Sequence, residues 1–415
     1  MDNLINRKEY LEQLSAWREK DMIKVVTGVR RCGKSTLFEL YIKLLKSDGV
    51  ADKQIILINL EDDDYCELLN YKKLHTYVNA HLQKDMVTYL FIDEIQNCKE
   101  YERAISSLFL RKNIDIYITG SNAYMLSGEL ATKLTGRYIE IDMLPLSFIE
   151  FSKVVQIEDR NERFNQYMNM GAFPYATRLI DNSLSHSQYL EGIYSTVLVK
   201  DVITREGIND ITLVKSIAGF LSSNVGSPVS AKKIADTLTS SGRPTGSGTV
   251  DTYLAALTDA YLFYKVNRYD IKGKMHLKTE SKYYCCDTGL RNMILMTLNK
   301  DIGHQIENIV YLELLRRGYT INIGKSGRGT EVDFVAVRNK KTEYYQVSAS
   351  VLDENTLGRE LESLYKINDN YPKFLITLDA YIGDHSGVQQ INLVDWLTRE
   401  HSIDGGYDPC GNCKP

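Results

Sequence analysis

A short segment near the amino end has the residue types and spacing of a phosphate-binding loop. Residues 28–36 read GVRRCGKST and fit the pattern G-x-x-x-x-G-K-[ST], with an apolar run before them and an amphipathic stretch after them. In such a strand, loop and helix, backbone N–H groups and the helix N-terminus bind phosphate oxygens. We therefore predict that this loop binds the phosphates of ATP.

The motif gives the side chains of the loop different roles. Gly28 and Gly33 let the backbone approach the phosphates, Lys34 reaches the terminal ones, and Ser35 can ligate Mg²⁺. Thr36 is expected to lie close to the phosphates nearest the nucleoside. The sequence thus predicts both ATP and Mg²⁺ as ligands of this segment.

Two arginines and a cysteine, Arg30, Arg31 and Cys32, fill variable positions of the motif, where the backbone matters more than the side chain. We count Arg31 and Cys32 among the nucleotide-binding positions for that reason. The two arginine side chains could touch a phosphate or a partner subunit, but we expect them to be solvated.

Two acidic residues end the hydrophobic segment TYLFIDE, residues 88–94. Asp93 is predicted to hold Mg²⁺ through water, and Glu94 to orient and polarise the water that attacks the γ-phosphate. The alternative is that the pair caps the helix expected after it. Together with the loop, the pair indicates hydrolysis of ATP.

Three further polar residues could complete the site. Ser121 or Asn122, at the end of the apolar run 114–121, could hydrogen-bond the γ-phosphate or the water, although ordinary turn chemistry would also explain them. Arg137 could reach a nucleotide of a neighbouring subunit as an arginine finger, which would require a homo-oligomer, or it could be a surface arginine at the start of a strand.

The elements that must position these residues are read from short apolar runs that alternate with longer amphipathic stretches. The runs are residues 24–28, 54–60, 88–94, 114–121 and 138–143. Strands separated by helical lengths predict an α/β domain with a parallel sheet that helices cover on both faces.

Motifs along nearly the whole chain carry a resemblance to a known family. They are GVRRCGKST, FIDEIQ, TGSN, GRYIEI, LPLSFIEF, GAFPYA, KYYCCDTGLRN and TEVDF. The chain resembles the prokaryotic AAA-type ATPases of the archaeal-ATPase-like group, whose carboxyl-terminal domain has a restriction-endonuclease-like fold and no characterised function. The resemblance implies a P-loop core with an additional strand and sheet order 5-1-4-3-2, a winged helix, and a degenerate nuclease-like end.

The expected division of the chain follows from these patterns. It comprises an ATPase core at residues 1–145, a helical lid or linker at 146–208, a winged helix at 209–275, a restriction-endonuclease-like domain at 276–400 and a flexible tail at 401–415. In the middle part, three short helical patterns precede an extended segment, as in the winged variant of the helix-turn-helix.

A basic stretch, residues 265–282, directly follows the third of these helical patterns. It holds six Lys or Arg residues against two acids inside a chain of formal net charge -4. Such a β-ribbon could straddle the phosphate backbone of DNA with little base discrimination. Winged modules also dock proteins, and charged hairpins are often only solvated, so a protein partner remains the alternative.

The nuclease-like end lacks part of the expected metal chemistry. Glu307 is expected on a helix and Asp333 on a strand, but the following strand offers Gln346 and Ser348 where restriction-like nucleases have Glu-x-Lys. Glutamine brings no negative charge and serine no cation, so a divalent metal would be held weakly and the water left unactivated. Glu331 shares the strand face of Asp333 without replacing that lysine. We expect the fold to be retained for binding.

Bulk properties limit the remaining possibilities. A chain of 415 residues should divide into two to four domains, and its net charge excludes a general polycation. The sequence shows no signal peptide and no apolar run of membrane-spanning length, and its seven cysteines are scattered, which favours the reducing cytoplasm. Cys410 and Cys413 have CxxC spacing without a second ligand pair, so we expect a loose tail rather than zinc.

Three functions are compatible with these patterns. The first is an Mg²⁺-dependent ATPase that couples its nucleotide state to a DNA-binding carboxyl-terminal half. The second is a slow nucleotide switch or scaffold that holds a protein partner. The third is a metal-dependent nuclease gated by ATP.

Overall fold

The computed structural model describes residues 4–123, 134, 136–203, 208, 210–273, 275–296, 301–325 and 330–399. The chain forms two compact units. The first consists of residues 1–145, 193–209 and 256–262, and the second of residues 146–192, 210–255 and 263–415.

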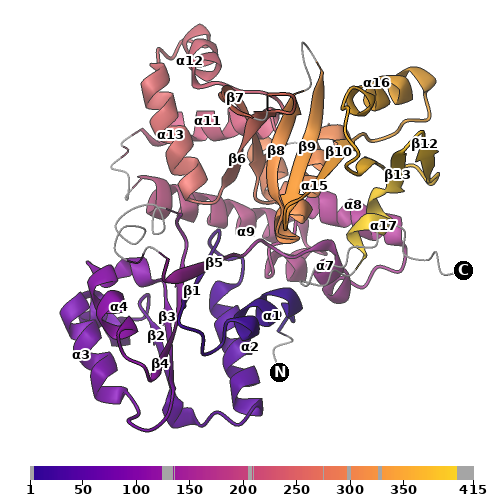
Figure 1. Ribbon diagram of the computed structural model, residues 1–415. Coiled ribbons are helices and arrows are strands. Elements are labelled where there is room, and N and C mark those ends of the chain that lie inside the picture. Colours follow the sequence, from indigo (N-terminus) through magenta and orange to yellow (C-terminus); the bar gives the residue numbers. More distant parts are fainter. Residues whose placement is uncertain are drawn as a thin grey trace, which may run out of the picture. The chain divides into compact units, whose positions relative to one another are not determined.

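The first unit is built on a parallel five-stranded sheet of order β2-β3-β4-β1-β5 (Figure 1). Its strands are β1 (Ile23–Thr27), β2 (Ile55–Asn59), β3 (Thr88–Asp93), β4 (Ile114–Gly120) and β5 (Tyr138–Asp142). This is the predicted order 5-1-4-3-2 read from the other edge, so the predicted α/β fold and its topology are confirmed. Every strand lies at a predicted apolar run.

Helices cover both faces of this sheet, as Figure 1 shows. They are α1 (Lys8–Ala16), α2 (Lys34–Ser47), α3 (Tyr71–His81) and α4 (Tyr101–Phe109). Short helical turns complete the unit: η1 (Asp52–Gln54), η2 (Asp63–Leu69), η3 (Ile95–Asn97) and the π-helix η5 (Val197–Ile203). We find α1 and α2 on one face and α3 and α4 on the other.

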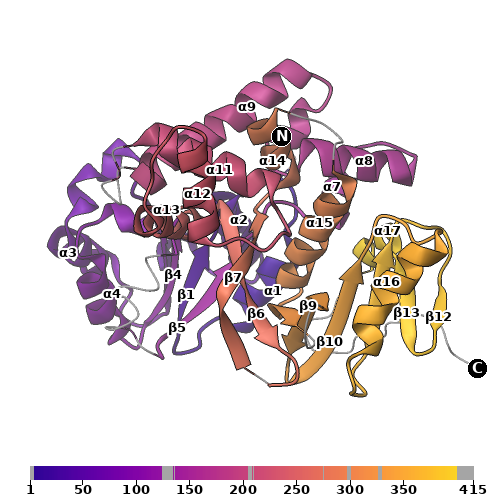
Figure 2. The same ribbon diagram turned by 90° about the horizontal axis from the view of Figure 1, so that it is seen from above.

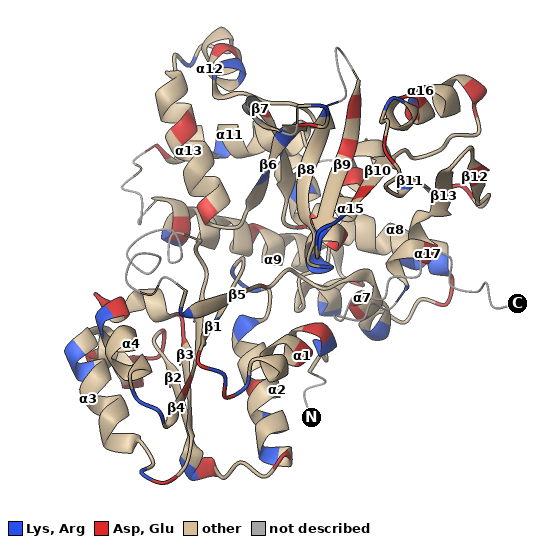
Figure 3. Cartoon of the chain, in the orientation of Figure 1, with Lys and Arg blue, Asp and Glu red and all other residues tan. Residues whose placement is uncertain are grey.

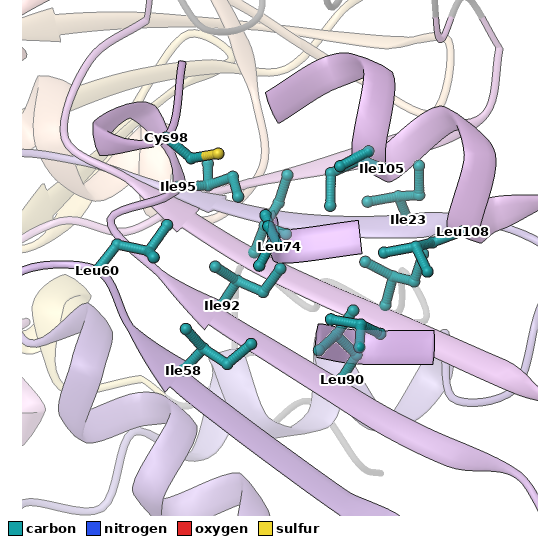
Figure 4. Packing of buried hydrophobic residues seen from close by; sticks show 14 of the residues in the cluster. Ile23, Ile58, Leu60, Leu74, Leu90, Ile92, Ile95, Cys98, Ile105 and Leu108 are labelled. Atoms are coloured by element: carbon teal, nitrogen blue, oxygen red, sulfur yellow. The ribbon is translucent and has the colours of Figure 1, made fainter. Parts of the chain in front are cut away.

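Alternation along the strands explains why both faces are buried. Leu90 and Ile92 of β3 belong to a cluster with Leu74 of α3 and Ile105 of α4 (Figure 4). Phe91, between them, points to the opposite face, where its ring lies 5.1 Å from that of Phe38 in α2. Because successive strand residues face opposite sides, one continuous apolar run packs against helices on both.

The second unit contains a mixed eight-stranded sheet of order β12-β13-β11-β10-β9-β8-β6-β7. Its strands are β6 (Phe263–Asp270), β7 (Met275–Cys285), β8 (Thr320–Lys325), β9 (Glu331–Arg338), β10 (Lys341–Val347), β11 (Lys373–Thr377), β12 (Gly383–His385) and β13 (Val388–Asn392). Figure 2 shows α15 lying along this sheet, where it packs against β7–β10, and α16 lying beside β9–β11.

Many helices lie beyond the first 145 residues. They are α7 (Phe148–Val154), α8 (Arg160–Met170), η4 (Ala176–Leu179), α9 (Ser183–Thr196), α11 (Ile211–Ser223), α12 (Ala231–Ser240), α13 (Ser247–Asp259), α14 (Thr288–Leu295), α15 (Ile302–Arg316), α16 (Glu354–Tyr365) and α17 (Leu393–Leu397). In the part of the chain that the structure describes, no helix combines the length and apolar character needed to cross a membrane.

Three helices and a β-hairpin stand where the winged-helix pattern predicts them. α11, α12 and α13 precede the antiparallel pair β6–β7, and Val229 forms a β-bridge with Ser281. The hairpin does not stand alone, however, because β6 also pairs with β8 and joins the eight-stranded sheet. β7 begins at Met275, so it crosses the domain boundary that was predicted after this residue. The winged helix and the division into five parts stay predictions.

Two of the sequence motifs, GAFPYA and CCDTGLRN, meet in this second unit. A Cβ atom on Gly289 would lie 2.1 Å from the carbonyl oxygen of Met170, so only glycine fits this approach of two backbones. Asp287 accepts hydrogen bonds from the N–H groups of Ala172 and Leu290, at 2.6 and 2.8 Å. Burial raises the pKa of Asp287 to about 6 in spite of these bonds. The motifs therefore join α8 to α14.

Candidate nucleotide-binding site

The loop between β1 and α2 needs its first glycine for two reasons. Gly28 has a φ of 137°, and a Cβ atom there would lie 2.2 Å from the carbonyl oxygen of Met143. Gly33, at the end of the loop, has a φ of 108° and precedes the first residue of α2. Left-handed backbone at these points turns the loop into the helix and is strained for any residue with a side chain.

An arginine that the sequence analysis missed fixes this loop to the chain beyond β5. Arg7 is buried, and its guanidinium donates hydrogen bonds to the carbonyl oxygens of Cys32, at 3.1 Å, and Leu144, at 2.7 Å. Cys32 itself is fully buried, and burial raises the pKa of its thiol. Nothing in the sequence around Arg7 signals this role, because its two partners are distant in the chain.

The first turn of α2 places the predicted ligands of phosphate and metal. Lys34 is buried and its Nζ donates to the carbonyl oxygens of Gly28, at 2.9 Å, and Val29, at 3.3 Å. Ser35 is exposed and Thr36 half-buried at the helix N-terminus. The lysine therefore lies against the loop that it is predicted to serve, and Ser35 faces solvent.

Asp93, the last residue of β3, lies beside Ser35. Its carboxylate accepts hydrogen bonds from the hydroxyl groups of Ser35 and Thr119. Burial raises the pKa of Asp93 above its ordinary value in spite of these bonds. A hydroxyl and a carboxylate side by side, at a helix N-terminus, are oxygen ligands of the kind that Mg²⁺ accepts in nucleotide sites. The two predicted metal ligands thus fit the ion.

Glu94 lies between two cations of the loop. Its carboxylate oxygens are 3.8 Å from Nζ of Lys34 and 3.8 Å from the guanidinium of Arg30, and Gln96 donates a hydrogen bond to it. Burial alone would raise the pKa of Glu94, but these partners outweigh it and hold the pKa below its ordinary value. The side chain caps no helix, unlike the alternative weighed from the sequence.

Arg30 is buried, which corrects the expectation that both loop arginines are solvated. Its guanidinium donates to Asp201 at 2.6 and 3.1 Å and to Glu61 at 2.9 Å. Arg31 is exposed, as expected, with a φ of 66°. The sequence could not assign Arg30 because its main partner lies 171 residues further along the chain.

The end of β4 brings Ser121 into contact with this network. Ser121 donates to Asp201 at 3.3 Å and accepts from Gln96 at 3.4 Å, and Gln96 in turn donates to Glu94. Asn122 is fully buried beside it. The predicted roles of Ser121 and Asn122 at the γ-phosphate stay predictions, and Gln96 links Ser121 to the residue proposed to orient the water.

Arg137 lies at the amino-terminal ends of the strands, whereas the loop lies at their carboxyl-terminal ends. It directly precedes β5, and its carbonyl oxygen accepts from the N–H of Ile23 at the start of β1. It lines a cavity of about 560 Å³ at this amino-terminal edge together with Phe109 and Arg111. Arg137 therefore cannot reach the nucleotide site of its own chain, and action on a neighbour's nucleotide stays a prediction.

In the second unit, three acids meet around one lysine. Nζ of Lys282 in β7 lies 3.1 Å from Glu307 in α15, 2.9 Å from Glu331 and 3.4 Å from Asp333 in β9. Figure 3 shows acidic residues along β9 and basic residues on the β6–β7 hairpin. Burial alone would lower the pKa of Lys282, but the three carboxylates outweigh it and raise the pKa. Burial raises the pKa of Glu307 to about 7.

This lysine corrects one expectation. Lys282 belongs to the basic stretch predicted to contact DNA, but its side chain is buried and paired with these acids. Alternation along β7 explains it, since Lys282 and Tyr284 share a face and both bond Glu307. Among the described residues, no group of three or more His, Cys, Asp or Glu side chains has the arrangement of a metal site.

The basic stretch 265–282 is only partly exposed. Arg268 is ion-paired with Glu280 at 2.6 Å and with Glu331 at 3.1 Å. Lys265 and Lys272 are exposed, while the side chains of Lys274 and Lys278 lie outside the described residues. Two of the six predicted basic contacts are thus engaged within the protein. The tail with Cys410 and Cys413 also lies outside the described residues.

Comparison with known proteins identifies a domain, two relatives and a similar fold. Residues 20–152 match a family model described as an AAA domain, and residues 161–301 match a domain of unknown function. An uncharacterised protein of Haemophilus influenzae is 38% identical, with 95% of this chain and 98% of that protein covered. Protein MJ1544 of Methanocaldococcus jannaschii, also uncharacterised, is 30% identical, with 92% and 86% covered.

Among solved structures, a Walker-type ATPase of Pyrococcus abyssi superposes with a TM-score of 0.51 at 14% identity, over 70% of this chain and 95% of that one, which shows similarity of fold. The chain therefore belongs to one family with the Haemophilus influenzae and Methanocaldococcus jannaschii proteins, and its residues 20–152 form an AAA domain with the fold of a P-loop ATPase.

Proposed function

We propose that this protein is a cytoplasmic, Mg²⁺-dependent ATPase whose nucleotide state is coupled to its carboxyl-terminal half. One observation carries the proposal: the loop lysine, the Ser35–Asp93 pair and the carboxylate of Glu94 meet at the carboxyl edge of one parallel sheet. This is the constellation that binding and hydrolysis of a nucleoside triphosphate require.

The residues divide the chemistry between them. The loop amides and Lys34 bind the phosphates, and Ser35 and Asp93 would hold Mg²⁺, which neutralises the charge of the terminal phosphates. Glu94, ionised because its pKa lies below the ordinary value, orients the water and accepts its proton.

The proposal is tested with a nucleotide-binding titration and Lys34→Ala. Loss of the ammonium removes a charge-assisted contact to the phosphates, so affinity for a fluorescent ATP analogue should fall by about 10- to 100-fold. Lys46→Ala, an exposed residue in the last turn of the same helix, is the matched control and should bind normally. Failure of the wild-type protein to bind ATP with Mg²⁺ would refute the proposed function.

One observation favours the second candidate, a slow nucleotide switch. Glu94 lies 3.8 Å from both Lys34 and Arg30 and accepts a hydrogen bond from Gln96, and these partners lower its pKa and so weaken it as a base. Basal turnover should therefore be slow and rise when a partner rearranges the site. A steady rate that neither DNA nor a co-purifying protein changes would speak against coupling.

We propose DNA as the partner of the carboxyl-terminal half. The support is the order of three helices and a β-hairpin, together with the exposed Lys265 and Lys272 on that hairpin. Such residues would bind the phosphate backbone rather than base edges. A protein partner remains the competing proposal, because the same surface could dock an acidic protein.

Salt dependence distinguishes these partners. If both lysines bind DNA phosphates, the double variant Lys265→Met, Lys272→Met should reduce the slope of log affinity against log salt by about 2, or roughly 0.9 for each lost contact. Fluorescence anisotropy with labelled duplex and single-stranded DNA at several salt concentrations measures this slope. Lys53→Met, exposed on η1, serves as the control. An unchanged slope would remove the hairpin from the DNA interface.

A further inference from the structure

The phosphate-binding loop holds a second cation besides Lys34. Arg30 donates two hydrogen bonds to the carboxylate of Asp201, which has no exposed surface, and one to Glu61. Asp201 belongs to the π-helix η5, and both segments are parts of the first unit. A two-point pair between a guanidinium and a buried carboxylate fixes the loop to this helix.

Arg30 also lies close to Glu94, beside the position predicted for the γ-phosphate. The carboxylate lies 3.8 Å from Lys34 and 3.8 Å from Arg30, so two cations of one loop face the same anionic group. A γ-phosphate bound by Lys34 next to Glu94 also comes within reach of Arg30, whose planar guanidinium matches phosphate oxygens. ADP ends one phosphate short of this position.

We propose that Arg30 recognises the γ-phosphate, and that Asp201 holds its guanidinium until ATP binds. ATP then draws Arg30 from Asp201 to the γ-phosphate and releases η5 from the loop, whereas ADP leaves the pair intact. This inference rests on the proposed ATPase function. It names the residue that distinguishes a nucleoside triphosphate from a diphosphate and the segment that responds.

The surroundings of Asp201 make the exchange feasible. Ser121 donates a hydrogen bond to the same carboxylate at 3.3 Å, so Asp201 keeps a donor when Arg30 leaves, which lowers the cost of breaking a buried pair. π-Helical turns are uncommon and occur frequently at functional sites. Ser121 also accepts a hydrogen bond from Gln96, which donates to Glu94, and this links the responding helix to the residue that orients the water.

The test compares ATP and ADP binding in matched variants. The double variant Arg30→Met, Asp201→Asn removes both charges together, so no buried carboxylate is left unpaired. Its affinity for a non-hydrolysable ATP analogue should fall by about 10- to 100-fold, while its affinity for ADP stays that of the wild type. Asp201→Asn alone loosens the hold on Arg30 and should raise the preference for ATP over ADP.

Arg103→Met, at an exposed arginine of α4, is the control. Equal changes for ATP and ADP in both variants would overturn the inference and leave nucleotide binding established. A wild-type protein that binds neither nucleotide would instead overturn the proposed function. Hydrogen exchange at residues 197–203 is the second readout: it should be faster with the ATP analogue than with ADP, and equal rates would contradict release of η5.

Discussion

Glu94→Gln should lower the turnover of ATP by about 10²- to 10⁴-fold, the range expected for loss of a general base. The amide keeps the size of the side chain and can still orient water, but it cannot accept a proton. Phosphate release at saturating ATP and Mg²⁺ measures the effect. Binding of ATP should persist or tighten, because the variant removes a negative charge that lies 3.8 Å from Lys34 and from Arg30, the two cations proposed to bind the phosphates.

Glu100→Gln is the matched control for this variant. Glu100 also has a positive φ and directly precedes a helix, but its side chain is exposed and paired with Arg103. We expect wild-type turnover there. Full hydrolysis by the Glu94 variant would remove that residue from its assigned role. If the wild-type rate is already too low for Glu94→Gln to change it, the slow switch is the better description.

Lys282→Met should destabilise the second unit by about 3–5 kcal/mol at neutral pH, the usual cost of removing one partner from a buried ion pair. The three carboxylates of Glu307, Glu331 and Asp333 would then face one another without the ammonium that now lies within 3.4 Å of each. Denaturant unfolding followed by the fluorescence of the buried Trp396 reports on this unit. A Trp17→Phe background removes the other tryptophan.

The loss should depend on pH in a definite direction. The pKa of Glu307 is about 7 in the folded state and 4.5 as the ordinary value, so the folded state binds its proton more tightly. Protonation of Glu307 therefore contributes its full stabilising free energy below pH 4.5, and this contribution is lost as the pH rises through 7. Without Lys282 the pKa of Glu307 should rise further. The free-energy gap between wild type and variant should therefore be small at pH 5 and largest at pH 8.

Lys272→Met, at an exposed lysine of the same hairpin, should stay within about 0.5 kcal/mol of the wild type at both pH values. A gap for Lys282→Met that is independent of pH would show that packing of the lysine stem, rather than its charge, stabilises the cluster. A gap near zero at pH 8 would contradict the buried ion cluster itself.

The strands and the loop could be predicted because their signals are local. Residues 24–28 and 88–94 are apolar runs of strand length, and the glycine spacing of residues 28–36 specifies a strand, a turn and a helix without reference to the rest of the chain. The pairing of Ser35 with Asp93 follows from the same pattern, since parallel strands bring their carboxyl ends to one edge.

The predictions of solvent exposure that were wrong have one common cause. Arg30 and Lys282 are charged residues whose types predict solvent exposure, and both are buried because distant carboxylates meet them. The role of Arg7 could not be predicted from the sequence either, because its partners are also distant in the chain.

The amino-acid sequence by itself determined which chemistry this protein can carry, because the phosphate loop, the paired acids and the alternating apolar runs each lie within a few consecutive residues. The tertiary structure alone decided which charges meet: Arg30 with Asp201, and Lys282 with Glu307 and Asp333. Those partners stand up to 171 residues apart, and no periodic pattern in a chain records which of its distant segments will share a buried surface.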